Sequence, residues 1–226
     1  MKALLLVGSP RRGRSASEAL GAYLLDRLEA HGLEVQKLYV YPALRSETRM
    51  DALIAAAAEA DLLIFSAPLY WDSLPAAVTK LLEILHQRLD DHVRPAEQRL
   101  VAISNCGFPE AQQNAIALRI YRCFGRQTGF TWAGGLALGG GEPIKGKPLA
   151  ESGGMVRNVI VALDQAGEAL GKGEPIPQEA VDLMAEPLMP AWMYRTMGNL
   201  GWNLQAVENG TWRQLRSEVW KGIETA

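Results

Sequence analysis

Short apolar runs alternate with longer segments of helical periodicity along the first two-thirds of the chain. Predominantly apolar runs, typical of strands covered on both faces, occupy residues 3–7, 61–66 and 100–104. Residues 33–40 and 130–138 are also predicted as strands, since glycines mark their ends. The hydrophobic pattern therefore predicts five strands.

Helices are predicted after these strands, because apolar residues there recur at three- and four-residue spacing. In the first helix Leu20, Leu24 and Leu28 fall on one face, and Ser15 or Ser17 can cap it. Further helices are expected over residues 50–59, 75–89, 110–126 and 155–170. Repeated β-then-α units with short connections predict an α/β fold with one doubly wound parallel sheet and helices on both faces.

The chain changes character where Gly and Pro cluster after the last of these helices. We expect a domain over residues 1–172 and a helical C-terminal extension over residues 173–226, rich in Met and Trp as far as Trp220. The spacing of Met189 and Met193 indicates a helix with an apolar face. That face packs on its own domain or forms a subunit interface or lid. Membrane-surface binding is the least supported alternative, because the polar face is poor in Lys and Arg.

Composition narrows the function classes. The 226 residues can bury a core without disulfides, and the net charge of −2 gives no reason to expect nucleic acid or an anionic membrane as a partner. We expect no membrane span, because no run reaches about 18 apolar residues. Two cysteines and the lack of a secretory signal predict a cytoplasmic protein with free thiols, Cys106 as a small buried residue and Cys123 in the core. The three histidines have no ligand spacing, so no metal site is expected.

The loop after the first strand is the clearest candidate for a ligand site. Residues 8–15, GSPRRGRS, connect a buried strand to the start of a helix. The unpaired N–H groups of a helix N-terminus suit a phosphate, and Ser9 and Ser15 add hydroxyl donors. The loop lacks the patterns of a nucleoside triphosphate site or a Rossmann dinucleotide site. A solvated helix cap is the alternative interpretation.

Two more loops lie at the same edge of the predicted sheet, where open parallel sheets bind ligands. Residues 66–75 place Tyr70 and Trp71 between two prolines, a rigid apolar surface that suits a flat conjugated ring. Residues 105–110 contain Gly107, which lets the backbone approach a ligand closely. Each loop alone also fits an ordinary connection or a subunit contact.

Together the three loops resemble the NADPH-dependent FMN reductase family of flavodoxin-like NAD(P)H oxidoreductases. The segment GSPRRGRS resembles the phosphate loop of that family, SAPLYWDSLPA its flavin-ring loop, and GFPE a segment found in some members. The resemblance covers about residues 1–140. It implies a flavodoxin-like sheet with strand order 2-1-3-4-5 and FMN as the cofactor.

The resemblance also implies a set of site residues. Those that hold the phosphate are Ser9, Pro10, Arg11, Arg14, Ser15 and Ala16. Those that border the ring are Pro68, Leu69, Tyr70, Trp71, Leu74, Asn105, Gly107 and Phe108. No catalytic side chain is expected, because the flavin supplies the chemistry. An iron–sulfur centre is excluded, because residues 39–51 contain no cysteine.

The implied activity is electron transfer from NAD(P)H through FMN to a small acceptor such as a quinone, an azo or nitro compound, or free flavin. A homodimer or higher oligomer is the expected assembly. The alternative from another class is a flavodoxin-type electron carrier or an FMN-bound redox sensor with a protein partner. The net charge argues mildly against a carrier, which usually docks through a strongly acidic surface. A flavodoxin-like fold that binds a different phosphate ligand is a third alternative.

Overall fold

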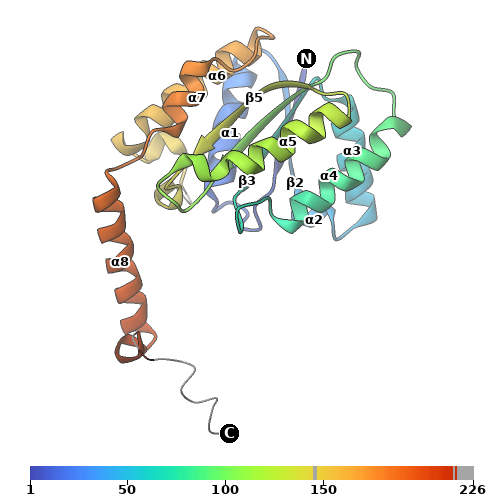
Figure 1. Cartoon of the computed structure of the whole chain (residues 1–226). Helices are drawn as coiled ribbons and strands as arrows, with labels where there is room; N and C mark the ends of the chain where they lie inside the picture. The colour runs from blue at the N-terminus through green and yellow to red at the C-terminus, as the bar shows by residue number, and fades with distance from the viewer. Residues whose placement is uncertain (145–146, 216, 218–226) are drawn as a thin grey trace, which may run out of the picture. The chain divides into compact units, whose positions relative to one another are not determined.

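The computed structural model describes residues 1–144, 147–215 and 217. Within them, five parallel strands form one sheet in the order β2-β1-β3-β4-β5 (Figure 1). The strands are β1 (Lys2–Val7), β2 (Glu34–Tyr39), β3 (Leu62–Pro68), β4 (Arg99–Asn105) and β5 (Thr131–Leu138). The predicted α/β class, the parallel sheet and the strand order are confirmed.

Helices cover both faces of this sheet, and Figure 1 shows them in two groups. One face carries α1 (Ala16–Ala30), α6 (Arg157–Gly171) and α7 (Gln178–Ala185), and the other α2 (Val40–Ala43), α3 (Glu47–Glu59), α4 (Ala76–Arg88) and α5 (Ala115–Gln127). Alternate residues of β1 enter the two cores: Leu5 packs in the core with α1 and α6, and Leu6 in the core with α3 and α4. Both faces are apolar because both are covered.

Short 3₁₀ segments join several of these elements. They are η1 (Leu89–Asp91), η2 (Ala111–Asn114), η3 (Glu142–Ile144), η4 (Leu149–Glu151), η5 (Gly154–Val156) and η6 (Trp212–Gln214). The helix predicted over residues 110–126 is thus η2 followed by α5. The helix predicted from residue 50 begins at Glu47, since the Ser46 hydroxyl caps it by accepting from the Arg49 N–H at 3.4 Å. Cys123 was expected in the core but is exposed, on the outer side of α5.

The chain separates into two compact units, Met1–Leu188 and Met189–Ala226. The first includes α7, which packs against α6 and β5, so this boundary lies one helix beyond the division expected at residue 172. The second contains α8 (Ala191–Glu208) and η6. Trp220 lies outside the described residues. Among the described helices, none has the length and apolar character needed to span a membrane.

Candidate functional site

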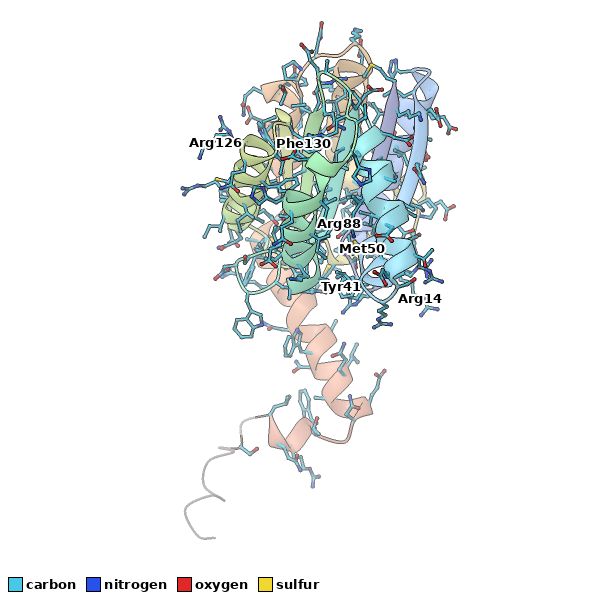
Figure 2. All side chains as sticks on the ribbon, turned by 90° about the vertical axis from the view of Figure 1, so that its right-hand side faces the viewer. Arg14, Tyr41, Met50, Arg88, Arg126 and Phe130 are labelled. Carbon is cyan, nitrogen blue, oxygen red and sulfur yellow. The ribbon has the colours of Figure 1, made fainter. Side chains whose placement is uncertain are left out.

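The first loop leaves β1 in close contact with the neighbouring strand. The Gly8 N–H donates to the Ser66 carbonyl of β3 at 2.8 Å. A Cβ at Gly8 would lie 2.5 Å from Val78 Cγ2 and 2.8 Å from the Ala67 Cβ, so no other residue fits there without a shift of its neighbours. The loop backbone is therefore held against β3 and α4 at the carboxyl edge of the sheet. Figure 2 shows Arg14, from this loop, at the opposite end of the domain from Phe130, which precedes β5.

The loop ends in a helix N-terminus with unused donors. Ser15 is the N-cap of α1, and its hydroxyl accepts from the Glu18 N–H at 3.1 Å. The N–H groups of Ser15, Ala16 and Ser17 have no hydrogen-bond partner within the part of the chain that the structure describes, although all three residues are buried. Buried donors need an acceptor, and a helix N-terminus favours an anion. This cradle therefore fits a phosphate group.

A buried carboxylate fixes the geometry of the loop. Glu18 Oε2 accepts from the Gly13 N–H at 2.6 Å, and Oε1 accepts from Lys37 Nζ at 3.0 Å and from the Tyr39 hydroxyl. Burial raises the pKa of Glu18, but the hydrogen bonds from Tyr39, Gly13 and Lys37 outweigh it and lower the pKa below its ordinary value. Glu18 is thus an anion at neutral pH, and it ties the first loop to β2.

The sequence analysis did not single out Glu18. Its spacing from Ser15 is that of a capping box, in which the carboxylate accepts from the N-cap N–H. Here the carboxylate reaches Gly13 instead, which leaves the Ser15 N–H available. The capping-box pattern was the signal that could have identified this residue.

The second loop is a tight turn after β3. The N–H groups of Tyr70 and Ser73 each donate to the carbonyl of the other residue, at 2.9 and 3.0 Å. Between them Trp71 and Asp72 have φ values of 49° and 59°, as in a type I′ turn. Such φ values are tolerated by glycine, asparagine and aspartate, as at Asp72, but they are unfavourable for a bulky residue such as Trp71. The turn places Trp71 at its tip, where the indole is fully exposed.

The third loop is held by the end of β5. The Gly141 N–H donates to the Cys106 carbonyl at 3.0 Å and the Gly140 N–H to the Phe108 carbonyl at 2.6 Å. A Cβ at Gly107 would meet nothing within 4 Å, so the backbone there borders open space. The three glycines after β5 thus pack against the third loop and hydrogen-bond to its backbone.

Buried side-chain hydrogen bonds join the three loops. The Ser17 hydroxyl donates to Asn105 Oδ1 at 2.6 Å, and the Ser66 hydroxyl donates to the Ser17 carbonyl at 2.6 Å. The Asn105 N–H₂ group has no partner within the described ranges, which leaves a donor in the cavity wall. Since all three bonding residues are buried, the relative position of the loops is defined without a ligand.

The three loops enclose a cavity at the carboxyl edge of the sheet. Its walls contain ten of the predicted residues, namely Ser9, Arg11, Arg14, Ser15, Ala16, Pro68, Leu69, Tyr70, Asn105 and Gly107. Four predicted residues do not line it: Pro10, Trp71, Leu74 and Phe108. Leu74 is buried in the core, whereas Pro10, Trp71 and Phe108 are exposed. Four lining residues were not predicted: Ser17, Cys106, Gly141 and Glu142.

Cys106 has the environment of an inert thiol. It is buried, its Sγ contacts the Phe108 carbonyl at 3.4 Å, and Asn114 Nδ2 donates to it at 3.3 Å. Burial is the main effect and raises the pKa of the thiol. The group stays protonated at neutral pH. Within the described residues no cluster of His, Cys, Asp and Glu could hold a metal ion.

Comparison with known proteins identifies the fold. The family model described as flavodoxin-like fold matches residues 1–88. The structure is similar to an NADH:FMN oxidoreductase in its apo form, with 17% identity and a TM-score of 0.56 over 84% of this chain and 96% of that chain. It is also similar to a protein from Klebsiella pneumoniae described as a quinone reductase, with 20% identity and a TM-score of 0.55 over 78% and 87%.

A flavodoxin from the domain Archaea is a third similar structure, with 12% identity and a TM-score of 0.53 over 76% of this chain and 98% of that chain. No curated protein matches the chain. At these identities the similarity identifies the fold, and the chain has the flavodoxin-like fold.

Proposed function

We propose that this flavodoxin-like chain is an FMN-dependent oxidoreductase that transfers electrons from NAD(P)H to a small acceptor, such as a quinone, an azo or nitro compound, or free flavin. The observation that supports it best is the cavity itself. Three loops meet at the edge of the sheet where this fold binds ligands. They bring together backbone N–H groups that could bind a phosphate, an apolar wall, and Gly107, whose backbone borders open space. The similarity to an NADH:FMN oxidoreductase and to a quinone reductase agrees with this function.

The residues present fit FMN in two respects. The N–H groups of Ser15, Ala16 and Ser17 match the acceptor oxygens of a phosphate, and Arg11 and Arg14 supply positive charge. Pro68, Leu69 and Tyr70 give the cavity an apolar wall that suits a planar ring.

When bound, FMN supplies the redox chemistry, since it stores a hydride equivalent from NAD(P)H and passes two electrons to the acceptor. The chain itself has to bind the flavin and the substrates, orient them and shield them from water. The Asn105 amide can donate to a polar edge of the ring, where negative charge grows on reduction. The exposed rings of Tyr70 and Trp71 offer flat apolar surfaces beside the cavity for a planar substrate.

An absorbance spectrum tests this function directly. We expect purified protein incubated with FMN and then desalted to keep the flavin bands, and anaerobic NADPH or NADH to bleach them. Bands that persist after both donors are added would contradict the oxidoreductase and favour the electron carrier or redox sensor. A protein that retains no FMN would contradict the cofactor as well.

We further propose that the chain is a homodimer, on the basis of α8. Met193, Met197, Leu200, Leu204 and Val207 follow one another at alternating four- and three-residue spacing, the pattern of a helix–helix seam. All but Met193, which is half-buried, are exposed, and α8 has just two charged residues in its sequence. Burial of such a stripe against a second copy of the chain would stabilise a dimer.

Replacement of Leu200 by glutamate tests the dimer. A charge in the middle of the stripe would have to be buried, so Leu200→Glu is expected to shift the protein from dimer to monomer in multi-angle light scattering. Gln205→Glu is the matched control, because Gln205 lies outside the stripe, about 120° around α8 from its centre, and its variant should remain dimeric. A wild-type monomer, or two dimeric variants, would contradict the proposal.

We also place the protein in the cytoplasm. Both cysteines are free and Cys123 is exposed, which suits a reducing compartment.

A further inference from the structure

Two rows of like charge lie beside β5, the edge strand of the sheet. The basic row consists of three exposed arginines of α5 at three- and four-residue spacing, Arg119, Arg122 and Arg126. The acidic row repeats this spacing on α7 and its C-cap, with three exposed carboxylates, Glu179, Asp182 and Glu186. The two helices pack on opposite faces of β5, as Figure 1 shows. The edge of the sheet is therefore positive on one face and negative on the other.

Neither row is neutralised within the chain. None of these side chains forms an ion pair within the described residues. In the acidic row, Asp182 and Glu186 accept from side-chain amides, which are uncharged. The sequence has no acidic residue over 111–141 and no basic residue over 173–194. Like charges at this spacing destabilise an isolated helix, so each row needs the opposite charge from elsewhere.

A groove of about 380 Å³ lies between the two helices at this edge. Arg119 and Arg122 of the basic row line it, Val181 lines it from α7, and residues of β5 lie between them. The half-buried Trp132 ring rests on the strand at Gly135, where a Cβ would lie 2.9 Å from its Cζ2. The groove thus places apolar surface next to the basic row, as in the core and rim of a protein interface.

The strand in this groove lacks the usual protection of a sheet edge. β5 has no charged side chain, whereas β2 at the opposite edge has Glu34 and Lys37. Exposed edge strands ordinarily have charged residues or are covered by another segment. The Ile176 N–H donates to the Ala133 carbonyl at 2.7 Å, which covers one position of β5. The uncharged edge and the groove therefore suit contact with another protein surface.

A second copy of the chain can satisfy both rows at once. A two-fold axis parallel to β5 at this edge exchanges the two faces of the sheet, so α5 of one copy comes beside α7 of the other. A two-fold interface repeats every contact, so each basic row faces an acidic row. Arg122 and Asp182 are the middle members of their rows and meet in this arrangement.

We infer that the β5 edge is an interface between two copies of this chain, in which the basic row of each copy binds the acidic row of the other. The interface is separate from the α8 stripe, so the two contacts together assemble dimers into tetramers. Exposed ion pairs are individually weak and are screened by salt, so this contact forms at low ionic strength and is lost in about 0.5 M NaCl. The α8 seam is apolar, and light scattering at the higher salt therefore reports α8 alone.

Sedimentation velocity in about 50 mM and about 0.5 M NaCl tests the inference. We expect the mass at low salt to be twice that at high salt. Arg122→Glu and Asp182→Arg each place like charges opposite one another and should weaken the low-salt association by about tenfold or more. An equimolar mixture of the two variants should associate again, because each altered charge then faces an altered charge of opposite sign in the other variant.

Arg49→Glu is the matched control, since it makes the same change of charge at an exposed arginine of α3, outside both rows. It should associate as the wild type does. An equal wild-type mass at both salt concentrations would overturn the inference, as would a mixture of the two variants that does not associate. A control variant as impaired as Arg122→Glu would also overturn it, because net charge and not the rows would then govern association. None of these measurements requires bound FMN, so the result is independent of the proposed function.

Discussion

Replacement of Glu18 by alanine is expected to weaken FMN binding by about 30-fold, which corresponds to roughly 2 kcal/mol. Without the carboxylate, the Gly13 N–H and Lys37 lose their acceptor, and the phosphate loop is no longer tied to β2. The N–H groups at the start of α1 are then less well positioned for the phosphate. Riboflavin lacks the phosphate, so its affinity should change little. Equilibrium titration by flavin fluorescence measures both affinities.

Glu18→Gln distinguishes the effect of the hydrogen bond that holds the loop from the effect of the negative charge. The amide oxygen can still accept from Gly13, so this variant should bind FMN more tightly than Glu18→Ala. If Glu18 acted instead by repelling the phosphate, both variants would bind FMN more tightly than the wild type. An equal loss of FMN and riboflavin affinity would indicate general disruption of the domain rather than of the phosphate loop.

Gly139→Ala is expected to lower the free energy of unfolding by about 3 kcal/mol, at the severe end for a single methyl group. A Cβ at this position would lie 2.3 Å from the Pro109 carbonyl oxygen and 2.9 Å from the Ala111 nitrogen. These are backbone atoms, so relief requires movement of the whole third loop. That loop supplies Asn105 and Gly107 to the cavity, and FMN affinity should fall together with stability.

Urea unfolding followed by circular dichroism measures the loss. Gly154→Ala is the matched control, since its Cβ would meet nothing within 4 Å and its backbone is not in the left-handed region. It should leave the unfolding midpoint nearly unchanged. A Gly139→Ala protein as stable as this control would mean that the third loop tolerates displacement.

The strands could be predicted because most of the sheet is covered by helices on both faces, and such strands appear as apolar runs. Their order was expected only from the resemblance to a flavodoxin-like family. The first loop was predictable for a related reason, since a buried strand, a glycine and a helix cap follow one another directly in the sequence. The least accurate boundary was the start of the helix after β4, where η2 precedes α5. There the backbone changes helix type with no proline or glycine to mark it.

The rest of the site depends on contacts that local patterns do not contain. Glu18 meets partners on β2 that are 19 and 21 residues away, and its role follows from that pairing alone. The exposed position of Trp71 follows from a turn that usually has glycine, asparagine or aspartate at both central positions, and here only Asp72 fits that preference.

The strand order has a consequence for synthesis on the ribosome. Because β1 pairs with both β2 and β3, three of the five strands can form their part of the sheet as soon as Pro68 has left the exit tunnel. Afterwards β4 joins β3, and β5 joins β4, each at the edge created by the strand before it. The opposite edge is β2, whose Glu34, Gln36 and Lys37 discourage pairing with another chain. The sheet of the nascent protein thus grows in one direction, and each new strand pairs with the edge that the previous strand left unpaired.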